Sequence, residues 1–206
     1  MFREIKWLFF DIGSTLIDEG AAYKCRMNEM ATAAGVSFET VYETAMGFYR
    51  QNRKGDLETA KLLGIQLPKW YSEEERLYPD AAECLRTLHD RYRIGIIANQ
   101  IPGTKERLAK HGILQYIDLV IASAEEGVAK PDKRIFEIAL ERSGCRPENA
   151  IMIGDRIDND IVPAKQLGMK TIRIKQGFGQ YWSTTSEVEE PDMTIDHLAD
   201  LSGILL

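Results

Sequence analysis

The amino-acid sequence predicts an α/β fold, a doubly wound parallel sheet with a helical cap domain. Three observations predict it. Short apolar runs that end at a polar or glycine residue are typical of strands buried on both faces. The later runs alternate with helical patterns, which predicts parallel strands joined by right-handed crossovers, with helices on both faces. One long stretch, from about residue 20 to residue 78, contains no strand-like run and interrupts the alternation.

Five apolar runs supply the predicted strands. The first is Trp7-Leu8-Phe9-Phe10, and it ends at Asp11. The others cover residues 94–98, 117–122, 150–153 and 171–174. Between the later runs, apolar residues recur at spacings of three and four, which predicts helices over residues 104–110, 132–142 and 159–167. The glycines that follow these segments are plausible helix C-caps: Gly112, Gly144 and Gly168.

The interrupting stretch is predicted to be a helical cap domain inserted after the first strand. It contains helical patterns over residues 21–34, 39–53 and 57–63. Pro79-Asp80-Ala81 then predicts a helix start that marks the return to the sheet. The chain therefore divides into a core domain, residues 1–17 and 79–206, and a cap domain, residues 18–78. Open α/β sheets bind ligands outside the carboxyl ends of their strands, and we expect the cap to lie there.

Composition and charge exclude several classes of protein. The 206 residues include 26 Lys+Arg against 32 Asp+Glu, a formal net charge of −6. This argues against nucleic-acid binding, which needs a basic face. No apolar run approaches the roughly 18 residues that suggest a membrane span, and the N-terminus has no signal-peptide layout. The three cysteines are far apart, which favours reduced thiols. We therefore expect a cytoplasmic protein with neither nucleic-acid nor membrane partners.

Polar residues stand directly after the first two predicted strands. Asp11 follows the first, and a carboxylate at the end of a buried strand is costly unless it is paired or bound to a metal. Gly13 is expected to let the chain turn sharply. Asn99 and Gln100 follow the second strand. Their amides could bind anionic oxygens, or they could satisfy the loop backbone, which is the more common role.

Charged residues stand at two further positions of the same predicted edge. Lys130 precedes the 132–142 helix and is a compact charge suited to phosphate, although most lysines are simply exposed. Asp155, Asp158 and Asp160 follow the fourth strand, and such close acids repel one another unless a cation or solvent screens them. Oxygen ligands at a strand end suit Mg²⁺. Asp158 is more simply explained as a helix N-cap, whereas Asp155 lies too close to the strand for that role.

These features, in this order at four strand ends, resemble the haloacid dehalogenase (HAD)-like hydrolase superfamily, with a small helical cap inserted after the first strand. The resemblance covers nearly the whole chain and implies a Rossmann-like core. It implies that Asp11 is the nucleophile and Lys130 a second catalytic residue. It also implies a Mg²⁺ site made by Asp11, the Gly13 carbonyl, Asp155 and Asp160, where Asp160 binds either directly or through water. The residues implied to bind the phosphate or other anionic group are Asn99, Gln100 and Lys130.

Two positions depart from the pattern of the family. Phosphatases of the family carry a second aspartate two residues after the nucleophile, where it moves the proton of the leaving group, and here that position is Gly13. Such acid–base catalysis contributes typically ~10²–10⁴-fold. The family also usually has Ser or Thr where this chain has Ala98. Asp18 and Glu19 are the nearest replacement acids in the sequence, although a solvated hinge is the simpler expectation for each.

The departure at Gly13 leaves three interpretations open. The protein could be a phosphatase that takes its acid from elsewhere. It could act on leaving groups that need no proton, such as those of acyl or aryl phosphates, or on a non-phosphate bond, as dehalogenases do. It could also be a weakly active or non-catalytic module that binds Mg²⁺ and phosphate.

We expect the hydrolase, because Asp11, Lys130 and Asp155 all remain. Specifically, the resemblance implies a Mg²⁺-dependent phosphatase that acts through an aspartyl-phosphate on a small phosphorylated metabolite. Its efficiency depends on how the missing acid is replaced. Cap aromatics such as Tyr23 and Tyr49 could line the pocket, but their main expected role is in the cap's own core.

Overall fold

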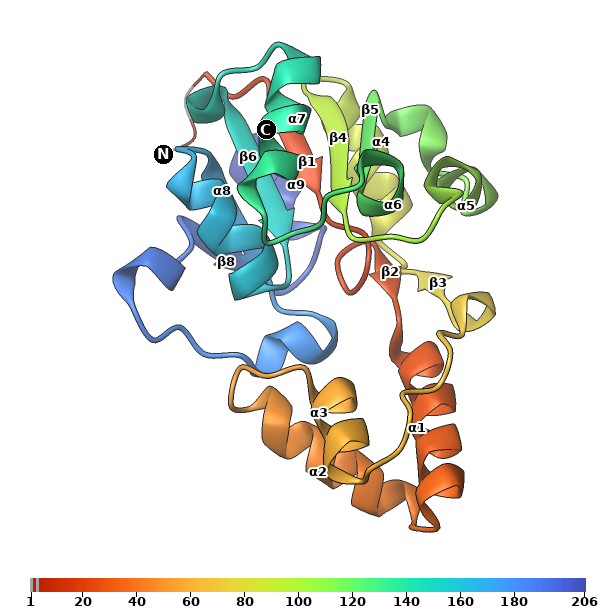
Figure 1. Ribbon diagram of the computed structural model, residues 1–206. Helices are drawn as coiled ribbons and strands as arrows, with labels where there is room; N and C mark the ends of the chain where they lie inside the picture. The colour runs from red at the N-terminus through yellow and green to blue at the C-terminus, as the bar shows by residue number, and fades with distance from the viewer. Residues whose placement is uncertain (1, 3) are drawn as a thin grey trace.

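The computed structural model describes residue 2 and residues 4–206, and its central layer is a six-stranded parallel sheet (Figure 1). The strand order is β5-β4-β1-β6-β7-β8. This confirms the predicted doubly wound α/β class. The bounds of the strands are β1 Trp7–Phe10, β4 Arg93–Ala98, β5 Leu119–Ala122, β6 Ala150–Gly154, β7 Lys170–Ile174 and β8 Met193–Ile195.

The central strand β1 is buried on both faces. Leu8 and Phe10 point into one hydrophobic cluster and Phe9 into another, and all three are fully buried. Alternate side chains of a strand point to opposite faces, so the continuous apolar run supplies both layers of core. Burying each such side chain contributes about 1.5–3 kcal/mol. This packing holds the end of β1, and therefore Asp11, in place.

Helices cover both faces of the sheet. One cluster joins the strands to α4 (Ala81–His89), α5 (Thr104–Lys110) and α9 (Asp200–Leu205). The other joins them to α7 (Lys133–Ser143) and α8 (Val162–Gln166). Short helical segments complete this part of the chain: η2 Leu114–Tyr116, α6 Ser123–Glu126, η3 Pro147–Asn149, η4 Ile157–Ile161, η5 Gly177–Tyr181 and η6 Glu187–Glu189. Among the described helices, none has the length and apolar character to cross a membrane.

Several elements differ from the sequence expectations. In the cap, the helix expected over 39–53 ends at Tyr49, and the short strand β3 (Arg76–Leu77) lies in the stretch expected to contain no strand. Strand β8 was not predicted, because its three residues form too short an apolar pattern. Strand β5 begins at Leu119 rather than at residue 117, because residue 117 follows directly on the turn η2; the Asp118 carboxylate accepts a hydrogen bond from Ile94 N (2.9 Å). The helix predicted over 159–167 is instead a π-helical turn, η4, followed by α8, with Pro163 in the first turn of α8.

Three helices lie between β1 and the rest of the sheet in the sequence, and in space they lie beyond the carboxyl ends of the strands (Figure 1). They are α1 (Gly20–Ala34), α2 (Phe38–Tyr49) and α3 (Gly55–Leu62). They share a separate hydrophobic cluster that includes Met27, Met30, Val41 and Met46. This separate core supports our proposal that residues 18–78 form a cap domain and that residues 1–17 and 79–206 form the core domain. Residues 1 and 3 of the core-domain range lie outside the described residues.

Two connections join the cap helices to the sheet. One is a short antiparallel ribbon made by β2 (Ile17–Asp18) and β3 (Arg76–Leu77), with the turn η1 (Ser72–Glu74) before β3. The other is a contact with the loop after β7. There Asn52 donates to the Ser183 carbonyl (2.7 Å) and accepts from Ser183 N (2.9 Å). The Phe178 ring stacks on Tyr49 with centroids 4.2 Å apart. These contacts hold the cap against the carboxyl edge of the sheet.

Candidate active site

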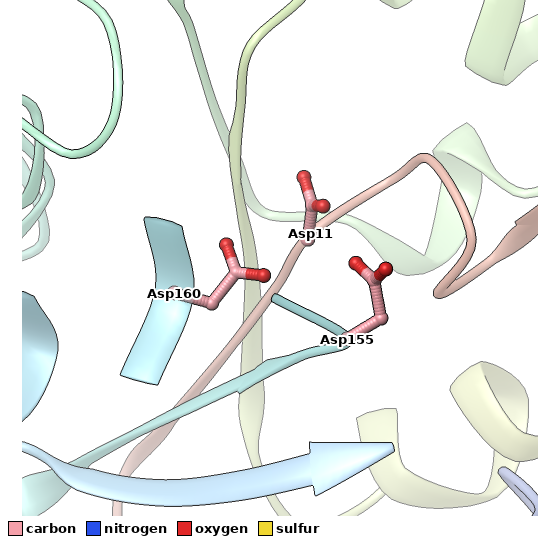
Figure 2. A group of neighbouring side chains, drawn as sticks. All are labelled: Asp11, Asp155 and Asp160. Atoms are coloured by element: carbon pink, nitrogen blue, oxygen red, sulfur yellow. The ribbon is translucent and has the colours of Figure 1, made fainter. Parts of the chain in front are cut away.

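Three aspartates meet at the carboxyl edge of the sheet. Asp11 follows β1, and its backbone N–H donates to the Ile153 carbonyl of β6 (2.9 Å). Asp155 follows β6, and Asp160 lies in η4. Figure 2 shows the three carboxylates gathered around one space, and one oxygen from each lies within 4.8 Å of the others. Neighbouring parallel strands end at the same edge, which is why residues so distant in the sequence converge.

Lys130 provides the positive charge of this cluster. Its side chain is buried, and its Nζ lies 2.7 Å from Asp11 Oδ1 and 2.6 Å from Asp160 Oδ1. Burial alone would lower the pKa of Lys130, but the two carboxylates outweigh it and the pKa is raised. Lys130 is therefore held as a cation between two acids, and it is not the exposed lysine that a lone Lys in a sequence usually is.

The three acids differ in how their charge is balanced. Asp160 accepts from Lys130 Nζ through Oδ1 and from Arg156 N through Oδ2 (3.0 Å). Burial raises the pKa of Asp160 to about 6, with Lys130 opposing the rise. Asp155 is also buried, and within residues 4–206 its carboxylate makes no hydrogen bond or ion pair. Its burial, then the charges of Asp160 and Asp11, raise the pKa of Asp155 well above the usual range. Asp155 is the acid with the greatest need of a cation.

Asn99 and Gln100 line the site, and the protein engages both ends of the Asn99 amide and the amide oxygen of Gln100. Asn99 Nδ2 donates to the Lys130 carbonyl (2.9 Å), and Asn99 Oδ1 accepts from Lys130 N (2.8 Å). Gln100 Oε1 accepts from Arg107 (2.9 Å). The role that the structure gives Asn99 is thus to fix the backbone of Lys130. This is the backbone-satisfying role considered from sequence, and contact of either amide with a substrate stays a prediction.

Asp158 does not cap a helix. Its carboxylate pairs with the Arg156 guanidinium at 2.6 Å, and no side-chain cap is found at the start of η4. Arg156 in turn lies over the Trp182 ring, 4.1 Å from its centroid. The N-cap expectation for Asp158 is therefore wrong, because a nearby guanidinium offers a stronger partner than backbone N–H groups do.

Gly13 has a different role from the one expected. The left-handed residue of the turn is Ser14, with φ 54°, so Gly13 is not needed for the sharp turn. A Cβ atom built on Gly13 would lie 2.6 Å from Glu19 Oε1. The Glu19 carboxylate occupies the space that a side chain at position 13 would take, and a larger residue there would displace it.

Glu19 is a site residue that the sequence reasoning set aside. The solvated hinge is confirmed for Asp18, which is exposed and accepts a hydrogen bond from Gly20 N (2.8 Å). It is wrong for Glu19, which is partly buried and accepts from Ser14 Oγ (3.0 Å). Burial raises the pKa of Glu19 to about 8, with the Ser14 hydrogen bond opposing the rise and Asp11 adding to it. Nothing in the sequence distinguishes the two neighbouring acids, although a Gly at position 13 was a signal that space was needed there.

Two adjoining cavities open at this edge. The first, about 180 Å³, is lined by Asp11, Lys130 and Asp155 from the sheet and by Tyr23 and Tyr49 from the cap. The second, about 360 Å³, extends between cap and sheet toward Trp70 and Arg107. Tyr23 and Tyr49 belong to the cap cluster as well, so both roles considered for these aromatics are present.

The loop after β7 closes the first cavity, and sequence reasoning missed it. Buried Arg173 donates to the carbonyls of Gly179 (2.8 Å) and Trp182 (2.7 Å) and holds the loop against the site. A Cβ on Gly179 would overlap the Asp155 carboxylate, so only glycine fits this close approach. A glycine in a loop far along the chain carries no sign that it will meet Asp155.

Comparison with known proteins points to one family. Residues 5–168 match a family model described as a haloacid dehalogenase-like hydrolase. The chain is 30% identical to a glyceraldehyde 3-phosphate phosphatase of Methanothermobacter thermautotrophicus, over 98% of this chain and 100% of that protein. It is 31% identical to the enzyme of that name from Pyrococcus furiosus, over 98% and 94% respectively. The crystal structure of a HAD phosphatase from Thermococcus onnurineus superposes with a TM-score of 0.68 at 25% identity, covering 98% of both chains.

Proposed function

This chain belongs to the haloacid dehalogenase-like hydrolase family, and we propose that within it the protein is a Mg²⁺-dependent phosphatase for a small phosphorylated metabolite. One observation carries the proposal. The Asp11 carboxylate faces the first cavity with Lys130 Nζ 2.7 Å away and Asp155 beside it. A carboxylate nucleophile, a fixed cation and an unpaired acid in one cavity are the groups that phosphoryl transfer by way of an enzyme ester requires.

The proposed reaction proceeds in two displacements. Asp11 attacks phosphorus as the bond to the leaving group breaks, and water then hydrolyses the aspartyl-phosphate. One oxygen of Asp11 is held by Lys130, which leaves the other for the attack. The ammonium of Lys130 offsets the repulsion between the carboxylate and the phosphate dianion, and Asp160 keeps the ammonium in position. Asn99 contributes by fixing the Lys130 backbone.

The residues present fit a Mg²⁺ ion. We propose that Asp11, the Gly13 carbonyl and Asp155 bind it directly. The backbone hydrogen bonds of this turn use the Ile12 carbonyl as acceptor and Ser14 N as donor, so they do not engage the Gly13 carbonyl. Asp160 has both oxygens engaged, and we assign it to the site through Lys130 and water. When bound, Mg²⁺ supplies positive charge to the transferring phosphoryl group.

The relatives named above act on glyceraldehyde 3-phosphate, a small phosphate ester, which supports a substrate of that size class. The cavities favour the same class, because about 180 Å³ beside Asp11 accommodates a phosphoryl group with a small organic group attached. The rest of the substrate would extend into the second cavity, between Trp70 and Arg107.

The proposal is tested with three substrate types at saturating Mg²⁺. We expect phosphate release from an aryl phosphate, p-nitrophenyl phosphate, and from an alkyl phosphate, glycerol 3-phosphate, and none without divalent metal. Chloride release from a 2-haloacid without metal would favour the dehalogenase chemistry instead. Binding of Mg²⁺ and phosphate with no turnover of any substrate would contradict the enzyme proposal and favour a binding module.

Mg²⁺ should also stabilise the protein. At a concentration of 100 times its dissociation constant, an ion that binds only the folded state adds about 2.7 kcal/mol. For a chain of this size this amounts to a rise of roughly 5–10 °C in the melting temperature. Asp155→Asn should abolish the rise and should itself stabilise the metal-free protein, because it removes an unpaired buried acid.

Asp158→Asn is the matched control for this measurement, because Asp158 lies three residues away and pairs with Arg156 outside the cluster. Its Mg²⁺-dependent shift should equal that of the wild type. An equal shift in the Asp155→Asn protein would place the ion elsewhere.

A further inference from the structure

The proposed reaction leaves one chemical requirement unmet. An alkoxide leaving group needs a proton as the phosphorus–oxygen bond breaks, and Gly13 cannot provide one. Lys130 is unsuited to this task, since its ammonium is held between Asp11 and Asp160. A donor has to lie beside Asp11, on the side where the substrate leaves, and it has to have a free polar atom.

Glu19 meets the first condition, because its carboxylate occupies the space that a side chain at position 13 would fill. A Cβ on Gly13 would lie 2.6 Å from Glu19 Oε1 and 2.8 Å from its carboxyl carbon. A longer side chain that begins at the entrance to the cap helix α1 therefore delivers a carboxyl group to the place that an aspartate two residues after Asp11 would reach.

Glu19 is also held with one oxygen free. Ser14, in its left-handed conformation, donates from Oγ to Glu19 Oε2 at 3.0 Å. Within the described part of the chain, Glu19 Oε1 makes no hydrogen bond, and Glu19 lines the first cavity. The carboxyl group is thus fixed at one oxygen and available to a ligand at the other.

The position of Glu19 between the two cavities identifies its target. Glu19 lines both of them, together with Tyr23, Asn99 and Gln100. A phosphoryl group beside Asp11 in the first cavity, joined to an organic group in the second, would pass its bridging oxygen along this shared wall. The bridging oxygen is the atom that must receive the proton.

We propose that Glu19 is the general acid and base of this active site, in place of an aspartate at position 13. The inference rests on the proposed phosphatase function. As the Asp11–phosphorus bond forms and the bond to the leaving group breaks, Glu19 gives its proton to the leaving oxygen. In the second displacement Glu19 takes a proton from the attacking water, whose oxygen bonds to phosphorus as the Asp11–phosphorus bond breaks. Glu19 is then protonated again, and the cycle balances.

Glu19→Gln separates the two steps. With glycerol 3-phosphate we expect turnover to fall by ~10²–10⁴-fold, the usual contribution of a general acid. With p-nitrophenyl phosphate the leaving phenolate needs no proton. The variant should then release nitrophenol in a burst of one equivalent per enzyme, followed by slow turnover, because the ester on Asp11 forms but is hydrolysed slowly. Equal losses on both substrates without a burst would show a merely structural role.

Asp18→Asn is the matched control, since it removes a carboxylate from the adjacent, exposed residue of the same linker. It should leave both substrates turning over at the wild-type rate. A wild-type protein that cleaves neither substrate would contradict the proposed function itself. A wild-type protein that cleaves glycerol 3-phosphate, with a Glu19→Gln variant equally active, would keep the function and overturn only the role of Glu19.

An exchange of positions provides the second test. Gly13→Asp alone is uninformative, because the new side chain would displace the Glu19 carboxylate while adding its own. The double variant Gly13→Asp/Glu19→Ala frees that space and places an acid at position 13. We expect it to hydrolyse glycerol 3-phosphate at least ~10-fold faster than Glu19→Ala, as part of the general-acid contribution returns. No gain in a double variant that melts like Glu19→Ala would contradict a shared role for the two positions.

Discussion

Replacing Asp11 by Asn should reduce phosphatase activity by roughly 10³-fold or more while leaving the protein folded. An amide cannot form the ester with phosphorus, so the covalent route is lost and only positioning by the surrounding groups remains. The fold should tolerate the change, because Asn has the shape of Asp and the backbone N–H of residue 11 keeps its bond to Ile153. Removing one of three crowded acids also reduces their mutual repulsion.

The measurement combines steady-state rates with mass spectrometry of a rapidly quenched reaction. In the wild type we expect one phosphoryl group on the peptide that contains Asp11, and in Asp11→Asn none. Asp158→Asn, which lies outside the cluster, is the control and should be labelled and active. Substantial turnover by Asp11→Asn, after exclusion of contaminating phosphatase, would remove Asp11 from the role of nucleophile.

Replacing Lys130 by Met should damage both stability and activity. Met is similar in length and apolar, but it leaves Asp11 and Asp160 without the cation that each contacts. Removing one partner of a buried charge pair costs about 3–5 kcal/mol, because the other partner stays buried and uncompensated. Activity should fall as well, since nothing then offsets the repulsion between Asp11 and the phosphate dianion.

A double variant distinguishes the two effects of Lys130. Lys130→Met/Asp160→Asn removes the charge from both ends of the 2.6 Å pair, so the free energy of unfolding should recover part of the loss seen in Lys130→Met. Activity should not recover, because Asp11 still lacks its ammonium partner. Denaturant melts of both variants provide the check. A Lys130→Met protein with wild-type stability would show that the buried charges are balanced by something else.

The sequence alone determined the fold class and the edge of the sheet at which Asp11 and Asp155 lie, because both depend on local patterns. Apolar runs such as 7–10 and 150–153 identify buried strands, and residues placed directly after parallel strands must share one edge of the sheet. Asp11 and Asp155 could be assigned to that edge without coordinates. The same reasoning placed the helical insertion, since a long stretch without strand patterns is visible in the sequence.

Only the tertiary structure decided which of two neighbouring polar residues points into the site. Asp18 and Glu19 are adjacent acids of the same linker, yet one is exposed and the other reaches the space beside Gly13. The choice depends on the direction of each side chain at the entrance to α1, which sequence spacing does not specify. Likewise, Asn99 could have faced a ligand or the backbone, and the bond pair with Lys130 settles where its amide points.

The meaning of Gly13 is the point at which sequence and structure differ most. By itself, the glycine marks the absence of a proton donor two residues after Asp11. In the folded protein, the absence of a side chain at Gly13 leaves a space that the Glu19 carboxylate fills, and a hydrogen bond from Ser14 holds that carboxylate there. Secondary-structure patterns depend on residues that are neighbours along the chain, so they can be predicted from the sequence. Occupancy of a space is decided by whichever side chain the fold brings there, and only the packed structure reveals it.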